Sequence, residues 1–531
     1  MQVIGKIIRG KYFDSVSLML VAREVLALPG VKDAAAVMAT DENKRILSSS
    51  GMEWPELAEA GDTDLALGIK AESEEQAADA LAQAEDLLAR KKASGAEGAA
   101  YQPRSLDSAL DENEDANLVL ISVAGRFAAE EAMKALRAGR HVMIFSDNVP
   151  LEEEIALKRY AAEKGLLVMG PDCGTAIIDG IPLAFANVVR RGSIGIVAAA
   201  GTGLQEVSSA IHNLGGGVSH AIGTGGRDIK KEVGGVTFLA GLQALQSDTG
   251  TEVVALVSKT PSPDVLDKLS VSIQKLGKPV VAVFVGADTE LVRKTGAIPA
   301  NSLEEAAQVA MALHRGEDVN AVHEKLRERD GQLEQQAVEY ANALGGERCY
   351  LRGLFCGGTF SQEAVHLLSP LLDDIHSNIA EPLKDPDRSV GHTIVDLGAD
   401  EYTSGRPHPM IDYSLRNRRI LDEARDPKTA VILLDVVLGY GSNRRPAEEL
   451  APVIREVCGM NDPPAVVFHV CGTDQDPQMR ADVISALREA GAMYAESNAA
   501  AVALAGMIVR RRSRAGFGGS ADGATKGEGN E

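Results

Sequence analysis

The sequence predicts an α/β fold of parallel sheets covered by helices, and three observations lead to this prediction. Short apolar runs alternate with helical patterns along most of the chain. Hydrophobic residues make up 45% of the 531 residues but aromatic residues only 4%, which is typical of strands buried on both faces. Glycine-bearing turns follow several of the apolar runs. A chain of this length holds roughly three to four domains.

The central stretch of the chain is 195–226, where a predicted strand leads through a glycine turn into a predicted helix. The apolar run Ile194–Ala200 predicts a buried strand, and the helical pattern begins at Leu204. The N–H groups and the dipole at the start of a helix favour an anion. The turn consists of Gly201, Thr202 and Gly203.

Two further glycine turns, at 169–175 and at 223–228, follow apolar runs near the first. Such turns line the strand-end crevice of a parallel sheet. We therefore predict that Gly201, Thr202 and Gly203, together with Gly225 and Gly226, bind a phosphate or carboxylate. We also expect Gly203→Val to block this approach with little change in thermal stability. The alternative is an ordinary turn that binds nothing.

The order of short motifs in 117–245 resembles the α subunit of succinyl-CoA synthetase and related ADP-forming acyl-CoA synthetases. These motifs are NLVLISV, AGRHVMIFSDNVP, MGPDCG, GSIGIVAAAGTGLQEV and GTGGRDI. Over nearly all of 1–507 the chain resembles the FdrA-type family, which extends that subunit at both ends. The resemblance implies a Rossmann-like CoA-binding-type half-domain and two flavodoxin-like domains, preceded by a small α+β domain.

Seven segments follow from these patterns. The first is ACT-like, with a β-α-β-β-α order, and is either a regulator-binding or an assembly module. The segments are a small α+β domain (1–90), a linker (91–116), a Rossmann-like domain (117–192), a flavodoxin-like domain (193–315), a helical connector (316–347), a second flavodoxin-like domain (348–510) and a disordered tail (511–531).

The chain departs from the synthetases at two points. The family's nucleotide-binding glycine loop does not precede Asn117. CoA is therefore a candidate cofactor that the resemblance does not establish, and no cofactor is assigned.

The second departure concerns the family's catalytic histidine and the glutamate that steadies it. Lys294 and Lys259 stand at these positions, and no histidine lies between His220 and His314. A protonated lysine cannot replace a neutral imidazole nucleophile. The two lysines predict a cationic crevice for a small anion, and ordinary surface lysines are the alternative.

Leu354–Thr359 resembles the glycine turn of the synthetase β subunit, which faces the turn of the α subunit across the phosphorylated histidine. The resemblance adds Gly357, Gly358 and Thr359 to the predicted anion site. No stretch resembles an ATP-grasp domain or a P-loop, so nucleotide hydrolysis by this chain is not expected.

Polar residues gather in the loops of the last domain, and charged loop groups after strands often mark a ligand site. We predict catalytic roles for His392, Asp396, Arg406 and His408 and name Asp412 and Arg416 as further candidates. Helix capping and loop hydrogen bonding are the alternative.

Composition and motif spacing also bear on nucleic-acid binding, membrane binding, metal binding and location. The net charge of −22 argues against sequence-independent binding of nucleic acid or of anionic membranes. The five cysteines are scattered without a CxxC pair, and no motif has metal-ligand spacing. No transmembrane run or signal peptide is evident, so we predict a cytoplasmic protein.

Three functions stay open. The first is a carbamoyltransferase subunit, because FdrA-type proteins are associated with oxamate carbamoyltransferase in allantoin and purine breakdown, together with partner subunits. The second is an ADP-forming acyl-CoA ligase, and the third is a non-catalytic scaffold. We expect an oligomer with partner protein subunits, and a small anionic substrate such as carbamoyl phosphate, an acyl phosphate or CoA.

Overall fold

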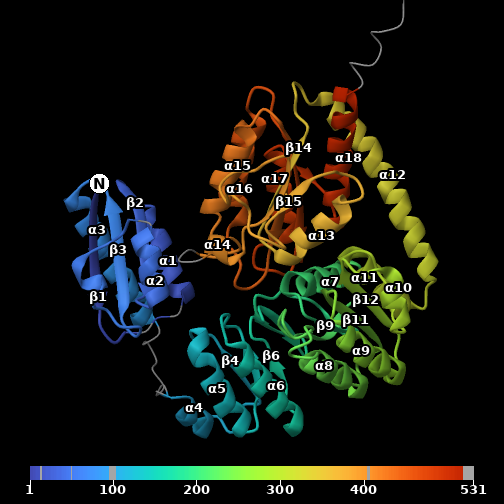
Figure 1. Ribbon diagram of the computed structural model, residues 1–531, viewed down its shortest axis with the longest axis horizontal. Coiled ribbons are helices and arrows are strands. Elements are labelled where there is room, and N and C mark those ends of the chain that lie inside the picture. Colours follow the sequence, from blue (N-terminus) through green and yellow to red (C-terminus); the bar gives the residue numbers. More distant parts are fainter. Residues whose placement is uncertain are drawn as a thin grey trace, which may run out of the picture. The chain divides into compact units, whose positions relative to one another are not determined.

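The computed structural model describes residues 1–11, 13, 15–49, 51–94, 103, 105–403 and 407–517, and they form two compact units. The first unit contains Met1–Ala116 and Ala399–His408. The second contains Asn117–Gly398 and the chain from Pro409 onward. The mixed α/β class with parallel sheets is confirmed (Figure 1).

The first unit is built on a three-stranded antiparallel sheet in the order β1-β3-β2. Helices α1 and α3 bury one face of this sheet in an Ala-, Val- and Leu-rich cluster. The predicted order missed α2, which lies between the second and third strands. The elements are β1 (Gln2–Ile8), α1 (Ser15–Leu26), β2 (Val31–Met38), α2 (Asp41–Ser49), the short helix η1 (Pro55–Leu57), β3 (Leu65–Ala71) and α3 (Glu74–Ser94).

The other face of this sheet is covered by Trp54, the only tryptophan of the chain. Its ring lies directly over two glycines, so that a Cβ atom at Gly5 would be 2.1 Å from the ring and one at Gly68 would be 2.9 Å away. Glycine at both strand positions therefore makes room for the indole.

We expect Gly5→Ala to destabilise the first unit by about 1–3 kcal/mol, because the added methyl group forces the ring out of its place. Unfolding in urea followed by Trp54 fluorescence measures this, since no other tryptophan contributes. Gly61→Ala is the control, because its Cβ would meet only a carboxylate oxygen at 3.7 Å. Equal unfolding midpoints for both variants would refute this packing.

The predicted linker 91–116 is partly helical. Helix α3 continues to Ser94, and α4 (Leu106–Glu112) forms within the same stretch. Ser105 explains the second helix, because its hydroxyl accepts a hydrogen bond from the N–H of Ser108 at 3.2 Å. Likewise, α18 (Asn498–Phe517) extends into the predicted tail, of which 518–531 lie outside the described residues.

The second unit begins with a three-stranded parallel sheet in the order β4-β5-β6. Its elements are β4 (Leu118–Ile121), α5 (Gly125–Arg137), β5 (His141–Ile144), α6 (Leu151–Lys164) and β6 (Val168–Met169). A buried network ties α6 to the next domain: Lys158 Nζ lies 2.9 Å from Glu154 and 2.8 Å from Asp228.

A seven-stranded sheet follows, in the order β13-β12-β11-β9-β10-β7-β8. The first five strands in this order are parallel, and β7 and β8 are antiparallel. Its elements are β7 (Thr175–Ile178), β8 (Ile181–Ala184), β9 (Arg191–Ala198), α7 (Gly201–Asn213), β10 (Val218–Gly223), α8 (Val236–Ser247), β11 (Val253–Lys259), α9 (Pro263–Leu276), β12 (Val280–Val285), α10 (Thr289–Lys294), β13 (Ile298–Pro299) and α11 (Leu303–Arg315).

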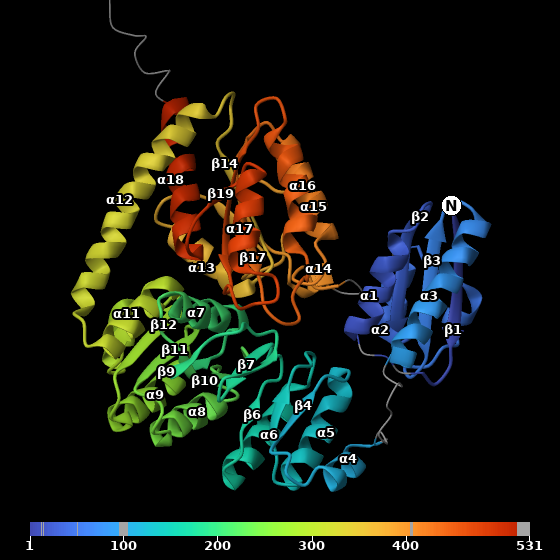
Figure 2. The ribbon, with the colours of Figure 1, turned by 180° about the vertical axis from the view of Figure 1, so that it is seen from behind.

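The last sheet has six parallel strands in the order β15-β16-β14-β17-β18-β19. The long helix α12 leads into it and packs along α18 (Figures 1 and 2). Its elements are α12 (Val319–Ala343), β14 (Tyr350–Phe355), α13 (Gly358–Leu368), β15 (Ile375–Ser377), β16 (His392–Asp396), α15 (Ser414–Arg425), β17 (Thr429–Val437), α16 (Pro446–Cys458), β18 (Ala465–Cys471), α17 (Arg480–Glu489), β19 (Met493–Tyr494) and α18; the short α14 (Asp400–Thr403) is counted with the first unit.

The two flavodoxin-like domains share one continuous apolar core, which runs from Ile177 to Val509. Polar contacts reinforce it at Asp476, whose carboxylate accepts hydrogen bonds from Val188 N (2.7 Å), Asn187 Nδ2 (2.8 Å) and Thr473 N (2.8 Å). The two domains are therefore joined as closely as the layers of a single domain.

Within the described part of the chain, none of the helices combines the length and the apolar character needed to cross a membrane.

Candidate functional site

Helix α7 begins where the strand order of the seven-stranded sheet reverses. Strand β9 has β10 on one side and β11 on the other. In open α/β sheets, ligands bind beyond the carboxyl ends of the strands at such a point. The turn Gly201–Gly203 follows β9, and the exposed Lys259 ends the neighbouring β11. The structure thus places this lysine at the same edge as the glycine turn.

The starts of α7 and α13 lie against each other (Figures 1 and 2). A Cβ atom at Gly357 would be 2.9 Å from Thr202 Cγ2, and one at Gly203 would be 3.1 Å from Thr359 Cγ2. The structure therefore brings together the two helix starts that the sequence predicted as partners.

No side chain caps the start of α7. Its N-cap residue, Ala200, offers no side chain to the helix, and the first backbone bond of the helix is donated by Leu204 N to Ala200 O at 2.9 Å. The N–H groups of Gly201, Thr202 and Gly203 therefore have no partner within the helix. Gly201 is exposed, whereas Thr202 and Gly203 are buried.

The carboxylate of Asp435 binds the two backbone N–H groups just before α13. Asp435 accepts hydrogen bonds from Cys356 N at 2.8 Å and Gly357 N at 2.9 Å. Arg416, fully buried beneath, donates to the backbone oxygen of Asp435 at 2.7 Å and to its carboxylate at 3.2 Å. Burial raises the pKa of Asp435, and the Arg416 charge opposes this shift.

Asp396, at the end of β16, is the second acid at α13. Its Oδ2 would lie 2.7 Å from a Cβ atom at Gly358, and its Oδ1 accepts from Gly398 N at 2.9 Å. Both helix starts therefore leave the N–H groups of their first three residues without a partner in the helix, and they differ in charge, because an acid lies beside the first residue of α13.

The expectation that Gly203 tolerates a bulky residue is wrong. A Cβ atom there would lie 2.9 Å from Val257 Cγ1 and 3.2 Å from Ala200 Cβ, in addition to its contact with Thr359. Gly201 is the position with room, since the only neighbour of its Cβ would be Thr175 Oγ1 at 3.8 Å.

The third glycine turn, at 223–228, packs against the second, at 169–175. Gly225 has a φ of 78°, and a Cβ atom there would be 2.2 Å from Pro171 O, so only glycine fits. Gly226 is exposed. Lys294 ends α10, toward the edge strand β13, which β12 and β11 separate from β9.

The predicted loop residues do not form one group. His392 begins β16 and Asp396 ends it, which separates them by about 13 Å. His392 Nδ1 accepts from Leu351 N at 3.2 Å, and burial lowers the pKa of its imidazole. Asp412 accepts from Ser414 N at 2.7 Å, at the start of α15.

The remaining two predicted residues lie elsewhere. Burial lowers the pKa of His408 to about 4, so its imidazole is neutral at pH 7, and the residue belongs to the first compact unit. Arg406 lies outside the described residues.

Sequence reasoning missed a buried polar cluster behind the two helix starts. It consists of Glu206 on α7, Glu363 on α13, Glu304 on α11, His469 and Cys471 on β18, and Asn498 at the start of α18. It also missed Asp435 as a site residue. A signal existed for Asp435, since it interrupts the apolar run of β17.

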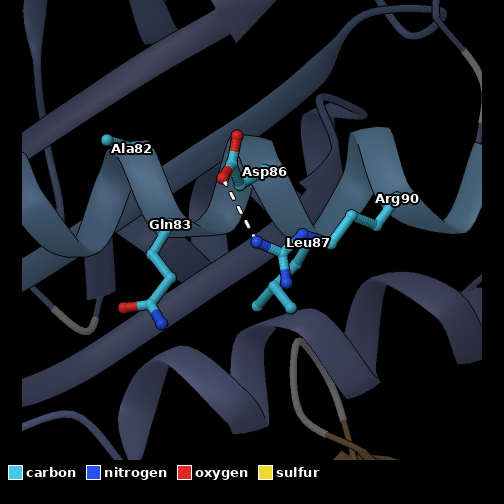
Figure 3. Close-up of a pocket in the computed structure, with 5 residues that line it drawn as sticks. All are labelled: Ala82, Gln83, Asp86, Leu87 and Arg90. Carbon is cyan, nitrogen blue, oxygen red and sulfur yellow. Dashed lines mark ion pairs between the residues drawn. The ribbon is translucent and has the colours of Figure 1, made fainter.

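A surface pocket lies in the first unit rather than at the two helix starts. It has a volume of about 360 Å³, lies over α3 and is lined by Ala82, Gln83, Asp86, Leu87 and Arg90 (Figure 3). Its one ion pair, Arg90 to Asp86 at 3.7 Å, joins residues one turn apart on the same helix. Among the described residues, no group of three or more His, Cys, Asp or Glu side chains is arranged to hold a metal ion.

Three family models match parts of the chain. They are described as CoA-ligase (354–508), CoA binding domain (189–286) and AllF, heavy metal-associated domain (1–104). The CoA binding match includes β9 and α7, rather than the preceding half-domain to which the resemblance assigned CoA. Residues 1–104 contain neither His nor Cys, so the segment that matches the third model has no imidazole or thiolate ligand for a metal.

Curated relatives extend this result. The chain is 28% identical over 190 residues to the α subunit of the ADP-forming succinate–CoA ligase of Methanothermobacter thermautotrophicus, covering 35% of this chain and 63% of that one. It is 28% identical to the α subunit of the malate–CoA ligase of Methylorubrum extorquens, with 33% and 60% coverage. The chain thus spans about three fifths of these subunits.

Among solved structures, ATP citrate lyase from Methanothrix soehngenii in complex with citrate and coenzyme A has a TM-score of 0.34 at 17% identity, covering 40% of this chain and 41% of that chain. Over nearly the whole length, the chain is 42% identical to the uncharacterized protein YahF of Escherichia coli K12, covering 92% of this chain and 95% of YahF. With the CoA-ligase, CoA-binding and AllF matches, this places the chain in the FdrA-type family of the succinyl-CoA synthetase α-subunit-like superfamily of ADP-forming acyl-CoA synthetases.

Proposed function

We propose that this chain is the donor-binding subunit of a carbamoyltransferase, which holds carbamoyl phosphate with its phosphate at the start of α7. The observation that carries the proposal is the inequality of the two facing helix starts. The phosphate end needs N–H donors without an acid beside them, and the start of α7 offers these. The acceptor end needs a group that takes up a proton, and Asp396 lies beside the start of α13.

In the reaction, an amide nitrogen of an oxamate-type acceptor bonds to the carbamoyl carbon. The bond from that carbon to the phosphate oxygen breaks, the nitrogen loses a proton to Asp396, and phosphate leaves. The N–H groups of Gly201–Gly203 stabilise the charge that develops on the leaving phosphate. Lys259, exposed at the end of β11, adds a positive charge at this edge. The transfer requires no phosphohistidine, in keeping with the missing histidine between His220 and His314.

The test is an assay of the chain, alone and with the products of neighbouring genes, for carbamoyl transfer between carbamoyl phosphate and oxamate in both directions. We expect transfer with partners present, and a loss of at least about 100-fold in Asp396→Asn, if its carboxylate is the base. Glu401→Gln, an exposed acid of the first compact unit, is the control. Full activity of Asp396→Asn would remove the base from the mechanism.

An acyl-CoA ligase is the second candidate function, and the CoA binding match over 189–286 favours it. It predicts tight CoA binding and an acid-labile phosphoryl group on the chain after incubation with ATP and magnesium. We expect no phosphoryl group on the chain, because it lacks a histidine in 221–313. Calorimetry with CoA and retention of radiolabelled phosphate decide between the two functions.

A further inference from the structure

The buried cluster behind the candidate site connects the two helices that form it. Asn498 is almost fully buried at the start of α18. Its Nδ2 donates to Glu363 Oε2 at 2.8 Å and to Phe360 O at 3.1 Å, both on α13. Its backbone N–H points to Glu206 Oε1 on α7 at 3.4 Å. A single residue thus contacts both helices, about one and a half turns behind their starts.

We propose that Asn498, which bonds to both Glu206 and Glu363, is a positioning residue of the anion site, and that it holds α7 and α13 in register only while the two acids are not both ionised. This inference rests on the proposed function, because the site it positions is the phosphate site at Gly201–Gly203. We name Asn498, Glu206 and Glu363 the clamp.

Few positive charges face the clamp, although Glu363 Oε1 accepts a hydrogen bond from Leu303 N, at the start of α11, at 2.7 Å. Facing Glu206 are Glu363 on α13, Glu304 on α11, and His469 and Cys471 on β18. His469 Nε2 lies 3.9 Å from Glu206 Oε2, and neither ring nitrogen has a hydrogen-bond partner. The Arg329 side chain on α12 forms ion pairs with Glu304 and Asp330. Arg480 on α17 acts on His469, whose pKa burial lowers to about 3, so this imidazole stays neutral.

Two adjacent carboxylates without a neighbouring cation are costly to ionise. Burial, followed by the charge of Glu363, raises the pKa of Glu206 to about 7, and burial raises that of Glu363 to about 7. A proton on either acid removes the repulsion between α7 and α13. Above pH 7 the second charge forms and pushes the two helices apart.

The sign of the pH effect follows from these shifts. Because both folded-state pKa values lie above the ordinary value of 4.5, folding takes up protons. The stabilising contribution is therefore complete below about pH 4.5 and is lost as the pH rises through about 7. We therefore expect α7 and α13 to separate, and anion binding to weaken, as the pH rises through about 7.

The experiment measures sulfate binding by calorimetry at about pH 6 and about pH 8, because the charge of sulfate is constant there, with inorganic phosphate and carbamoyl phosphate as further probes. We expect the affinity of the wild type to fall about tenfold between the two values, the size of one lost charged hydrogen bond. Glu206→Gln, which keeps the shape without the charge, should bind equally at both values. Asn498→Ala should bind about tenfold more weakly at about pH 6.

Thr251→Ala is the matched control. Thr251 is a buried polar residue just before β11, at the amino end of the strand, whereas the glycine turn lies at the carboxyl ends of the strands. Its loss should leave both affinities unchanged. If Asn498→Ala does not fold, the pH dependence of the wild type against Glu206→Gln still decides. Equal affinity at both pH values in the wild type, or a pH dependence retained in Glu206→Gln, overturns the clamp alone. A wild type that binds none of the probes at either pH overturns the proposed function and, with it, the site that the clamp would position.

Discussion

Replacing Asp476 with alanine is expected to lower the free energy of unfolding of the second unit by at least about 3 kcal/mol. The carboxylate satisfies three buried or half-buried donors, Val188 N, Asn187 Nδ2 and Thr473 N. Each donor left without a partner costs about 1–3 kcal/mol. For a unit of this size the loss corresponds to a fall in Tm of about 3–4 °C, measurable by calorimetry.

The contacts of Asp476 also predict what its loss does beyond stability. Asn187 Nδ2 bonds to Leu438 O at 3.0 Å, and Gln205 Nε2 on α7 bonds to Asn187 Oδ1 at 3.1 Å. The contacts of one carboxylate thus reach the helix that carries the candidate phosphate site. We expect Asp476→Ala to weaken phosphate binding as well as folding, and Asp476→Asn, which keeps one acceptor, to lie between.

Asp482→Ala is the matched control, since Asp482 is an exposed acid on the neighbouring α17. Its effect should be within about 0.5 kcal/mol, as for most surface changes. If Asp476→Ala and Asp482→Ala unfold at the same temperature, the polar junction contributes nothing, and the shared apolar core alone joins the two domains.

The class of fold was predictable because its signals are local. Apolar runs such as Ile194–Ala200 stand out against the helical patterns that follow them, and the structure has β9 and α7 at these positions. The errors came from weak local signals. Ser105 caps a helix inside a polar stretch, and α18 continues through a basic segment to Phe517, because its apolar side packs on α12 and α13.

The candidate site was predictable only in part, because glycine turns show in a sequence and tertiary contacts do not. The two turns at Gly201 and Gly357 were identified from their motifs, and their mutual contact followed from the resemblance. Nothing in the sequence indicates that Asp435 occupies the N–H groups of Cys356 and Gly357, since these residues are 78 or 79 positions apart. Nor does it indicate that Asn498 lies behind both helices, 135 positions from Glu363 and 292 from Glu206.

The glycine turn of α7 gives the second large effect, and its two outer glycines should respond differently. At Gly203 a valine would force apart α7, β11 and α13, because its Cβ would already lie 2.9 Å from Val257 and 3.1 Å from Thr359. We expect Gly203→Val to lose about 1–3 kcal/mol of stability, the usual cost of overpacking, together with phosphate binding.

At Gly201 a valine has room, since Thr175 Oγ1 at 3.8 Å is the nearest atom to its Cβ. We expect Gly201→Val to keep the Tm of the wild type and to lose phosphate and carbamoyl phosphate binding at least tenfold, because several charge-assisted hydrogen bonds at one helix start are obstructed together. Thermal unfolding with and without ligand measures both quantities in one experiment, since a bound ligand raises Tm. Gly331→Val, on an exposed turn of α12 with no atom near its Cβ, is the control. If Gly201→Val folds normally and is still stabilised by phosphate as the wild type is, α7 does not hold the donor, and the anion must be sought among the polar loops from His392 to Arg416.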